Sequence, residues 1–224
     1  MTKRLWFATL VTAALFIALQ LLEPKHEVPE LYGYRSPGLA LQMSHNWAQL
    51  STILSLEPAQ KARFVTQTYV DYGFLLAYGT LFSLLILHVY EGQRRWALLG
   101  LAVGAALCDA MENVWILAVL ELKGGYEDYM AQSIHRWALL KYFLVSCAWL
   151  AIGIGQPRQG RRLILGILYT AGGLIGLWAC LDNHRIPTAF LPIAIALLAQ
   201  LWIYWPSNAS ASFNSRATAS GSSL

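Results

Sequence analysis

Four ionisable side chains lie within apolar stretches of the sequence: Asp71, Asp109, Glu112 and Lys141. A charged side chain at the centre of a bilayer costs about 3 kcal/mol on insertion scales, so such residues face protein or water and find partners. Asp109 and Glu112 are three residues apart, and Asn113 follows Asp109 by four, so these three share one face of a helix. Carboxylates, an amide and an amine on facing helices can bind a polar ligand or carry a proton.

Lys141 is the one basic residue in this group, and its depth indicates its partner. At a rise of about 1.5 Å per residue, Glu112 and Lys141 lie about 12 and 10 Å below the same ends of two consecutive spans. Consecutive helices tend to pack side by side, so we predict that these two residues pair, with Asp109 as the alternative partner of the lysine. Tyr78 follows Asp71 by seven residues on the same helical face and can hydrogen-bond within the cluster.

The charges of this cluster do not balance. Three carboxylates and one lysine carry a net charge of −2 if all of them ionise. Burial and like-charge crowding oppose full ionisation, so we expect either one protonated carboxylic acid near neutral pH or a bound cation. Asp109 is the deepest carboxylate and is the predicted proton carrier. Asp71 lies near the end of its span and is expected to stay ionised in interfacial water.

A metal centre is the weaker alternative for the same end of the molecule. His45, His135 and His184 all fall on that side, and zinc favours histidine together with Asp or Glu. However, the sequence contains no HExxH or comparable spacing, no Gly-x-Ser-x-Gly motif and no phosphate-binding glycine loop. We therefore predict neither a metal nor another cofactor, and we assign no catalytic residue.

The chain as a whole is strongly apolar. Of its 224 residues, 57% are hydrophobic and 12% are charged, which is about half the charged fraction of a typical soluble domain. So few charges cannot cover a water-facing surface, which excludes a soluble globular protein, a disordered chain and a coiled coil. The net charge of +4 comes from Lys and Arg in short loops, a pattern typical of membrane topology and not of nucleic-acid binding.

Six apolar stretches are long enough to cross a bilayer, which needs about 20 residues of helix. They cover residues 5–22, 69–90, 96–120, 134–154, 163–181 and 186–205. The sequence therefore predicts an all-α transmembrane helical bundle of about six spans, in a single domain over residues 1–205. Residues 206–224 are polar and small, and are predicted to form a disordered cytoplasmic tail.

An extra amphipathic interfacial helix is predicted between the first two spans, over residues 36–56. Ser36 followed by Pro37 is typical of a helix start. Leu, Met and Trp residues then recur at spacings of three and four, which gives one apolar stripe. Such a helix lies flat at the membrane interface or covers the end of the bundle. Pro58 ends it, and we expect a long helix to run from there into the second span.

The loops predict the orientation of the bundle. Short loops rich in Lys and Arg stay in the cytoplasm, and three such groups fall on one side if every span crosses. These groups are Lys3 and Arg4, Arg94 and Arg95, and Arg158, Arg161 and Arg162. We therefore expect a multi-pass protein of the cell (inner) membrane, with both termini in the cytoplasm and the buried charges open to the external side.

Two motifs resemble a known group of proteins. Residues 71–79 read D-x-x-F-x-x-x-Y-G, residues 109–113 read D-x-x-E-N, and a lysine follows in the next span. This arrangement resembles uncharacterised bacterial polytopic integral-membrane proteins over residues 36–147. The resemblance implies that the motif residues form one site, and it implies no particular activity. The predicted ligand- or proton-binding residues are Asp71, Tyr78, Asp109, Glu112, Asn113 and Lys141.

Three functions fit these residues. The one we favour is binding or transport of a small polar or amphipathic ligand, coupled to protons if a carboxyl group carries one. The second is an intramembrane enzyme acting on a lipid or isoprenoid by acid–base or metal-assisted chemistry. The third is a structural membrane protein whose buried charges only tie helices together. The expected partners are the lipid bilayer, a lipid or small-molecule ligand and, through a small-residue face at Gly100 and Gly104, a second copy of the chain.

Overall fold

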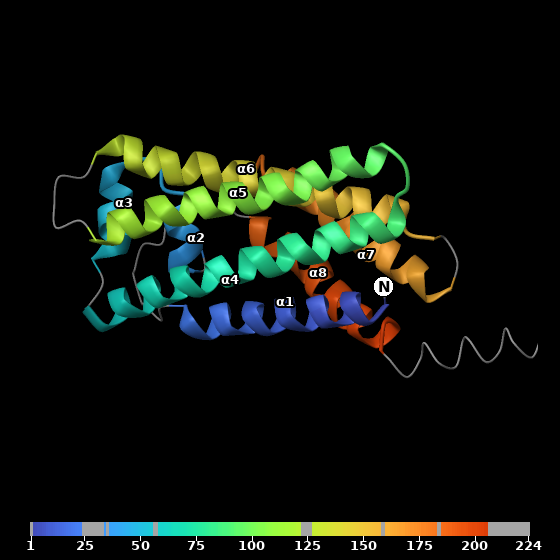
Figure 1. Ribbon diagram of the computed structural model, residues 1–224. Helices are drawn as coiled ribbons and strands as arrows, with labels where there is room; N and C mark the ends of the chain where they lie inside the picture. The colour runs from blue at the N-terminus through green and yellow to red at the C-terminus, as the bar shows by residue number, and fades with distance from the viewer. Residues whose placement is uncertain are drawn as a thin grey trace, which may run out of the picture.

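The structure is a computed structural model that describes residues 2–23, 34, 36–55, 58–121, 127–157, 160–182 and 185–205. All regular elements in these ranges are α-helices, and six of the helices are long and apolar enough to cross a membrane. The predicted all-α bundle is therefore confirmed (Figure 1). The six spans are α1 (Thr2–Leu22), α4 (Pro58–Val89), α5 (Arg94–Glu121), α6 (Asp128–Gly155), α7 (Arg161–Ala179) and α8 (Ile186–Ile203).

Helix α4 begins at Pro58, well before the predicted span at residue 69, which confirms the long helix expected from that proline. Proline has no backbone N–H to donate and its φ suits the first helical turn, so it starts a helix readily. The predicted tail, 206–224, lies outside the described residues. The division of the chain into one domain and a tail stays a prediction.

The predicted interfacial segment is helical, but it forms two short helices. These are α2 (Pro37–Gln42) and α3 (Trp47–Leu54). The Ser36 side chain accepts a hydrogen bond from the Leu39 N–H at 3.2 Å and caps α2. The Asn46 side chain accepts from the Gln49 N–H at 3.0 Å and caps α3. Helix α2 ends at Gln42 with Met43 as its C-cap, and Asn46 has the extended backbone of an N-cap residue, so residues 43–46 separate the two helices.

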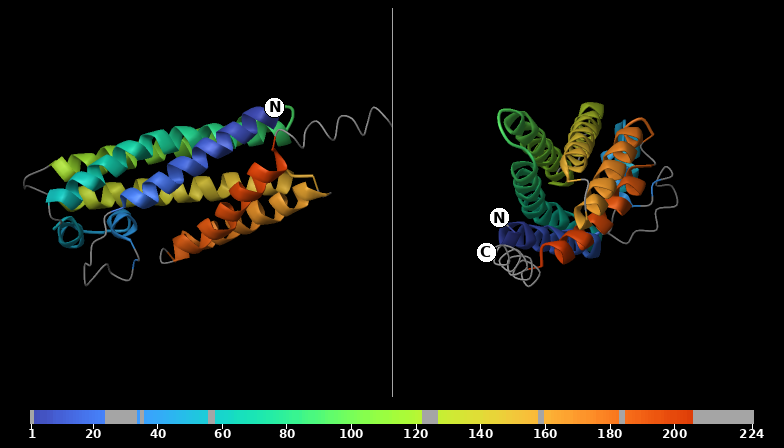
Figure 2. Two further views of the ribbon diagram at one scale, coloured as in Figure 1. Left: turned by 90° about the horizontal axis from the view of Figure 1, so that it is seen from below. Right: turned by 90° about the vertical axis from the view of Figure 1, so that its right-hand side faces the viewer.

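The spans pack in chain order, each against the next, and α8 returns to contact α1 (Figure 2). We call the end of the bundle that carries α2 and α3 the capped end, and the opposite end, which carries Thr2 and Ile203, the terminal end. Helices α1 and α8 meet at the terminal end, where Trp6 and Trp205 pack edge to face with ring centroids 5.5 Å apart. From there the two helices diverge toward the capped end, as Figure 1 shows.

Helices α7 and α8 are short, with 19 and 18 residues, whereas α4, α5 and α6 have 32, 28 and 28. The α7–α8 hairpin therefore does not reach as far toward the capped end as its neighbours (Figure 1). Helix α2 covers it: Met43, the C-cap residue of α2, packs in one buried cluster with Ala179 of α7 and Ile186 of α8. This contact places α2 over the middle of the bundle.

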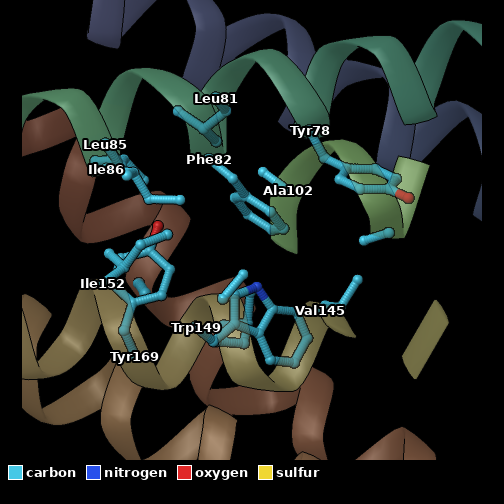
Figure 3. Close-up of a cluster of buried hydrophobic side chains, with 14 of the residues drawn as sticks. Tyr78, Leu81, Phe82, Leu85, Ile86, Ala102, Val145, Trp149, Ile152 and Tyr169 are labelled. Carbon is cyan, nitrogen blue, oxygen red and sulfur yellow. The ribbon is translucent and has the colours of Figure 1, made fainter. Parts of the chain in front are cut away.

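The main hydrophobic cluster fills the bundle on its terminal side. In Figure 3, Phe82 of α4 projects toward Trp149 of α6, with Ile152 and Tyr169 packed farther along. Helices α6 and α7 approach so closely that a Cβ at Gly173 would lie 2.6 Å from the backbone nitrogen of Leu150. Small residues drive such packing in membranes, where helices gain little from hiding apolar surface from each other.

Candidate functional site

Helices α5 and α6 bring the predicted lysine and carboxylates together. The Lys141 Nζ lies 2.6 Å from Glu112 Oε2 and 2.9 Å from Asp109 Oδ1. The predicted pairing with Glu112 is confirmed, and the alternative partner, Asp109, binds the same amine at the same time. Asp109 and Glu112 lie one turn apart on α5, so an amine on the facing helix can reach both.

Helix α4 adds two further predicted residues. The Tyr78 hydroxyl donates a hydrogen bond of 3.0 Å to Asp109 Oδ2. The Asn113 side-chain amide donates one of 2.7 Å to Asp71 Oδ2. Each of these bonds joins α4 to α5, so three consecutive spans contribute to two sets of polar contacts. One set joins Asp71 to Asn113, and the other joins Tyr78, Asp109, Lys141 and Glu112. We call these six residues the polar cluster.

The polar cluster is buried except at Asp71, whose side chain is partly exposed. Glu112 is 0% exposed and Lys141 is 8% exposed. An ion pair of this kind, in an apolar surrounding, needs good geometry and further hydrogen bonds to offset the loss of hydration. Asp109 has such support, because one oxygen contacts Lys141 and the other accepts from Tyr78. Glu112 is less well supported: its Oε1 has no hydrogen-bond partner within the part of the chain that the structure describes.

A cavity of about 560 Å³ lies next to the polar cluster. This volume falls within the range of roughly 300–1,000 Å³ that is typical of small-molecule sites. Helices α1, α2, α4, α5, α6 and α8 all contribute to its wall. Five residues of the polar cluster line it: Asp71, Tyr78, Asp109, Asn113 and Lys141.

The wall of the cavity changes character along the bundle. Near the capped end it carries polar side chains among apolar ones such as Leu39 and Phe64; the polar ones are Gln20, Glu23, Ser36, Gln42 and Gln67. Toward the terminal end it is apolar and aromatic, with Phe82, Val145, Trp149, Phe190, Ile193 and Leu197. Phe82 lies about 16 Å beyond Asp71 along α4, and Trp149 about 12 Å beyond Lys141 along α6. The polar cluster thus lies between a polar rim and an apolar floor.

Sequence reasoning missed Tyr142. Its hydroxyl donates a hydrogen bond of 2.6 Å to Gln42 Oε1 and so joins α6 to α2, while its ring lies 4.9 Å from the Lys141 Nζ. An available signal was its position next to Lys141, together with the polar side of the interfacial segment that carries Gln42. Trp149 and Phe190, whose ring centroids are 5.9 Å apart, gave no signal, because in a sequence an aromatic residue of a cavity wall cannot be distinguished from one of a packed core.

The histidines assemble only in part. His45 and His135 come together at the capped end with ring centroids 4.2 Å apart. His184 lies outside the described residues. Among the residues that are described, no three or more His, Cys, Asp or Glu side chains are grouped so that they could hold a metal ion.

The two glycines of the predicted oligomer face have different surroundings. A Cβ at Gly104 would lie 3.3 Å from Leu144 Cδ1 of α6, so this position contributes to packing inside the bundle. A Cβ at Gly100 would have no described atom within 4 Å. Self-association through this face stays a prediction.

Comparison with known proteins identifies no family for this chain. No protein-family model, no curated protein and no solved structure matches it. The cavity and the polar cluster are therefore the basis on which a function can be assigned.

Proposed function

We propose that this integral membrane protein binds an amphipathic ligand in the cavity. The polar part of the ligand lies against the polar cluster, and its apolar part lies against the floor formed around Phe82 and Trp149. The observation that carries this proposal is the wall itself: one cavity of about 560 Å³ presents buried charged groups and an aromatic, apolar surface side by side. A pocket that is mostly apolar, with a few convergent polar groups, is the usual form of a ligand site.

The arrangement of α1 and α8 supports entry of the ligand from the bilayer. The cavity is lined by Phe16 and Leu19 in the half of α1 nearest the capped end, and by Phe190 and Ile193 in the corresponding part of α8. In Figure 1 the two helices diverge toward this end of the bundle. A ligand with an apolar chain can then pass from lipid into the cavity without crossing water.

The basic residues at the terminal end indicate which side of the membrane the cavity faces. Helices α1, α5 and α7 all begin at the terminal end, and Arg94 and Arg161 are the first residues of the latter two. Short loops rich in Arg and Lys favour the cytoplasm. The proposal therefore places both termini in the cytoplasm of a cell whose inner membrane holds the protein, with the cavity opening toward the external side.

The geometry favours ligand binding over acid–base catalysis and over transport through the bundle. Lys141 contacts two carboxylates at 2.6 and 2.9 Å, so it acts as a cation that orders the cluster and not as a free base. On the terminal side, Leu85, Ile152 and Tyr169 belong to the packed hydrophobic cluster and are buried. This packing closes the path to the cytoplasm in the described conformation, so transport would need a second conformation.

Photolabelling tests the proposal. The protein is reconstituted in phosphatidylcholine vesicles with octadecyl probes that carry a diazirine in the chain and an alcohol, a carboxylate or an ammonium head. We expect at least one probe to label cavity-lining peptides of α1, α4, α6 and α8. Ala194→Trp places a large side chain in the cavity wall and should reduce that labelling about tenfold or more.

Ile195→Trp is the matched control. It adds the same side chain to the next residue of α8, which is 46% exposed on the outside of the bundle. The control should label like the unmodified protein. Labelling by every probe that is spread evenly over the lipid-facing surface, and equal in both variants, would overturn the proposal.

A further inference from the structure

The ion pairs of the polar cluster leave one carboxylate without a cation. Lys141 pairs with both Asp109 and Glu112. Asp71 makes no ion pair with any residue that the structure describes, and its hydrogen bond comes from the neutral amide of Asn113. With these groups in their ordinary ionised forms, the polar cluster carries a net charge of −2.

The rest of the cavity does not supply the missing positive charge. Among the described residues that line it, Lys141 is basic, whereas Glu23, Asp71 and Asp109 are acidic. The nearby Arg63 of α4 does not line the cavity, and its guanidinium donates to the backbone oxygen of Leu21 at 2.9 Å.

The cluster also lacks hydrogen-bond donors. Glu112 is completely buried, yet its Oε1 has no partner in the described part of the chain. Gln67, on the cavity wall one turn before Asp71, likewise has a buried Oε1 that accepts no hydrogen bond from described residues. Buried acceptors without donors are rare in folded proteins and call for a ligand, an ion or water. Glu112 does not line the cavity, so a ligand there would reach Gln67 and the Asp71 carboxylate instead. Both are acceptors, and Asp71 also lacks a cation among the described residues, so the partner that fits both is a cationic donor.

Aromatic rings lie beside Asp71 on the cavity wall. Phe74 of α4 is 6.1 Å from Phe16 of α1 and 5.3 Å from Tyr78, measured between ring centroids. All three rings line the cavity. Aromatic faces attract ammonium groups, and most strongly in sites shielded from water. A carboxylate next to such rings matches a cationic head group better than an anionic one.

We propose that the ligand is a cationic amphiphile, whose ammonium head binds Asp71 and whose apolar chain extends toward Phe82 and Trp149. This inference rests on the proposed function, because it names the ligand class of the same cavity. The ammonium group donates to the Asp71 carboxylate and neutralises its charge. The apolar floor accepts the chain.

Competition among head groups tests the inference. The ammonium, alcohol and carboxylate probes share one chain and are compared in neutral phosphatidylcholine vesicles, so that the bilayer charge does not concentrate one of them. We expect the ammonium probe to label cavity peptides about tenfold more than the alcohol probe, and the carboxylate probe to label them least. This comparison uses the unmodified chain and does not depend on the folding of a variant.

Two variants locate the head group. Asp71→Asn removes the charge but keeps an oxygen that can accept from Asn113, and it should lower ammonium labelling to the level of the alcohol. Glu121→Gln removes an acidic group that is exposed at the end of α5 and does not line the cavity, and it should leave the preference unchanged. Each variant is first checked for a single peak in size-exclusion chromatography.

The outcomes separate the two proposals. Cavity labelling that is equal for all heads, or that favours alcohol or carboxylate, overturns the cationic ligand and leaves the proposed function in place. A preference for ammonium that persists in Asp71→Asn overturns the role of Asp71. Absence of cavity labelling by every probe overturns the inference together with the proposed function on which it rests.

Discussion

Lys141 of α6 and Glu112 of α5 form a buried ion pair, with Nζ and Oε2 separated by 2.6 Å. Asp109 contacts the same amine at 2.9 Å, so one lysine is shared by two carboxylates on the facing helix. Because Glu112 is 0% exposed, the carboxylate cannot regain hydration if the amine is lost. The pair therefore couples the stability of the α5–α6 contact to the charge state of the polar cluster.

Replacing the lysine should destabilise the fold strongly. Lys141→Met leaves buried carboxylates without a cation, for which we expect a loss of about 3–5 kcal/mol in the free energy of unfolding. The double variant Lys141→Met/Glu112→Gln should recover part of this loss. The measurement is thermal unfolding in detergent. Equal Tm values for the single variant and the unmodified chain would contradict the account.

An exposed ion pair serves as the control for this experiment. Arg185 and Asp182 form a bond of 2.7 Å with side chains 48% and 42% exposed. Asp182→Asn should cost about 1 kcal/mol or less, because surface pairs are screened by solvent. Comparing the two ion pairs distinguishes the effect of burial on stability from the effect of removing a charge.

The hydrogen bond between Tyr142 and Gln42 should hold α2 on the bundle. Tyr142→Phe removes the donor and leaves the Gln42 acceptor unpaired, at a cost of about 1 kcal/mol. We expect faster hydrogen exchange in residues 37–42 of this variant. Tyr129→Phe, at a 48% exposed position of the same helix, should leave the exchange unchanged. Identical exchange in both variants would show that α2 is held by apolar contacts alone.

Close packing between α6 and α7 predicts that replacing Gly173 by a larger residue destabilises the fold. Gly173→Ala places a Cβ 2.6 Å from the Leu150 backbone nitrogen, so the helices must move apart, at about 1–3 kcal/mol. Gly100→Ala meets no described atom within 4 Å and should be neutral or slightly stabilising. Unfolding of both variants in detergent checks the difference. A neutral Gly173→Ala would contradict the close approach of α6 and α7.

The proposed orientation predicts which ends react with a reagent that cannot cross the membrane. In a chain whose three cysteines are replaced by alanine, Glu121→Cys lies at the capped end and Gln93→Cys at the terminal end. Both positions are exposed. In intact cells a charged maleimide should modify Glu121→Cys, and it should modify Gln93→Cys only after the membrane is opened. The reverse pattern would place the cavity on the cytoplasmic side.

Much of the fold is predictable because its signals are local. Span lengths, and the depth of Lys141 relative to Glu112, follow from hydrophobic runs and from the rise of a helix. The second contact, from Lys141 to Asp109, depends on how α5 and α6 rotate about their axes. The division between α2 and α3 depends on whether Asn46 caps a new helix or lies inside a continuous one. The spacing of the apolar residues on either side of Asn46 is compatible with both.

The cavity could not be predicted from sequence. It depends on the short α7–α8 hairpin, on the separation of α1 from α8 and on the cover that α2 provides. These are relations between segments far apart in the chain. Residues such as Trp149 and Phe190 carry no mark that distinguishes a cavity wall from a packed core.

A crystal structure of the full chain, grown in a lipid phase with dodecylamine brominated at the end of its chain, tests the central claim most directly. The account predicts elongated density inside the cavity, with the amine next to Asp71 and the anomalous bromine signal near Trp149 and Leu197. A cavity that is closed by its own side chains, or that holds only separate water-sized peaks while bromine stays in the bilayer, would contradict it.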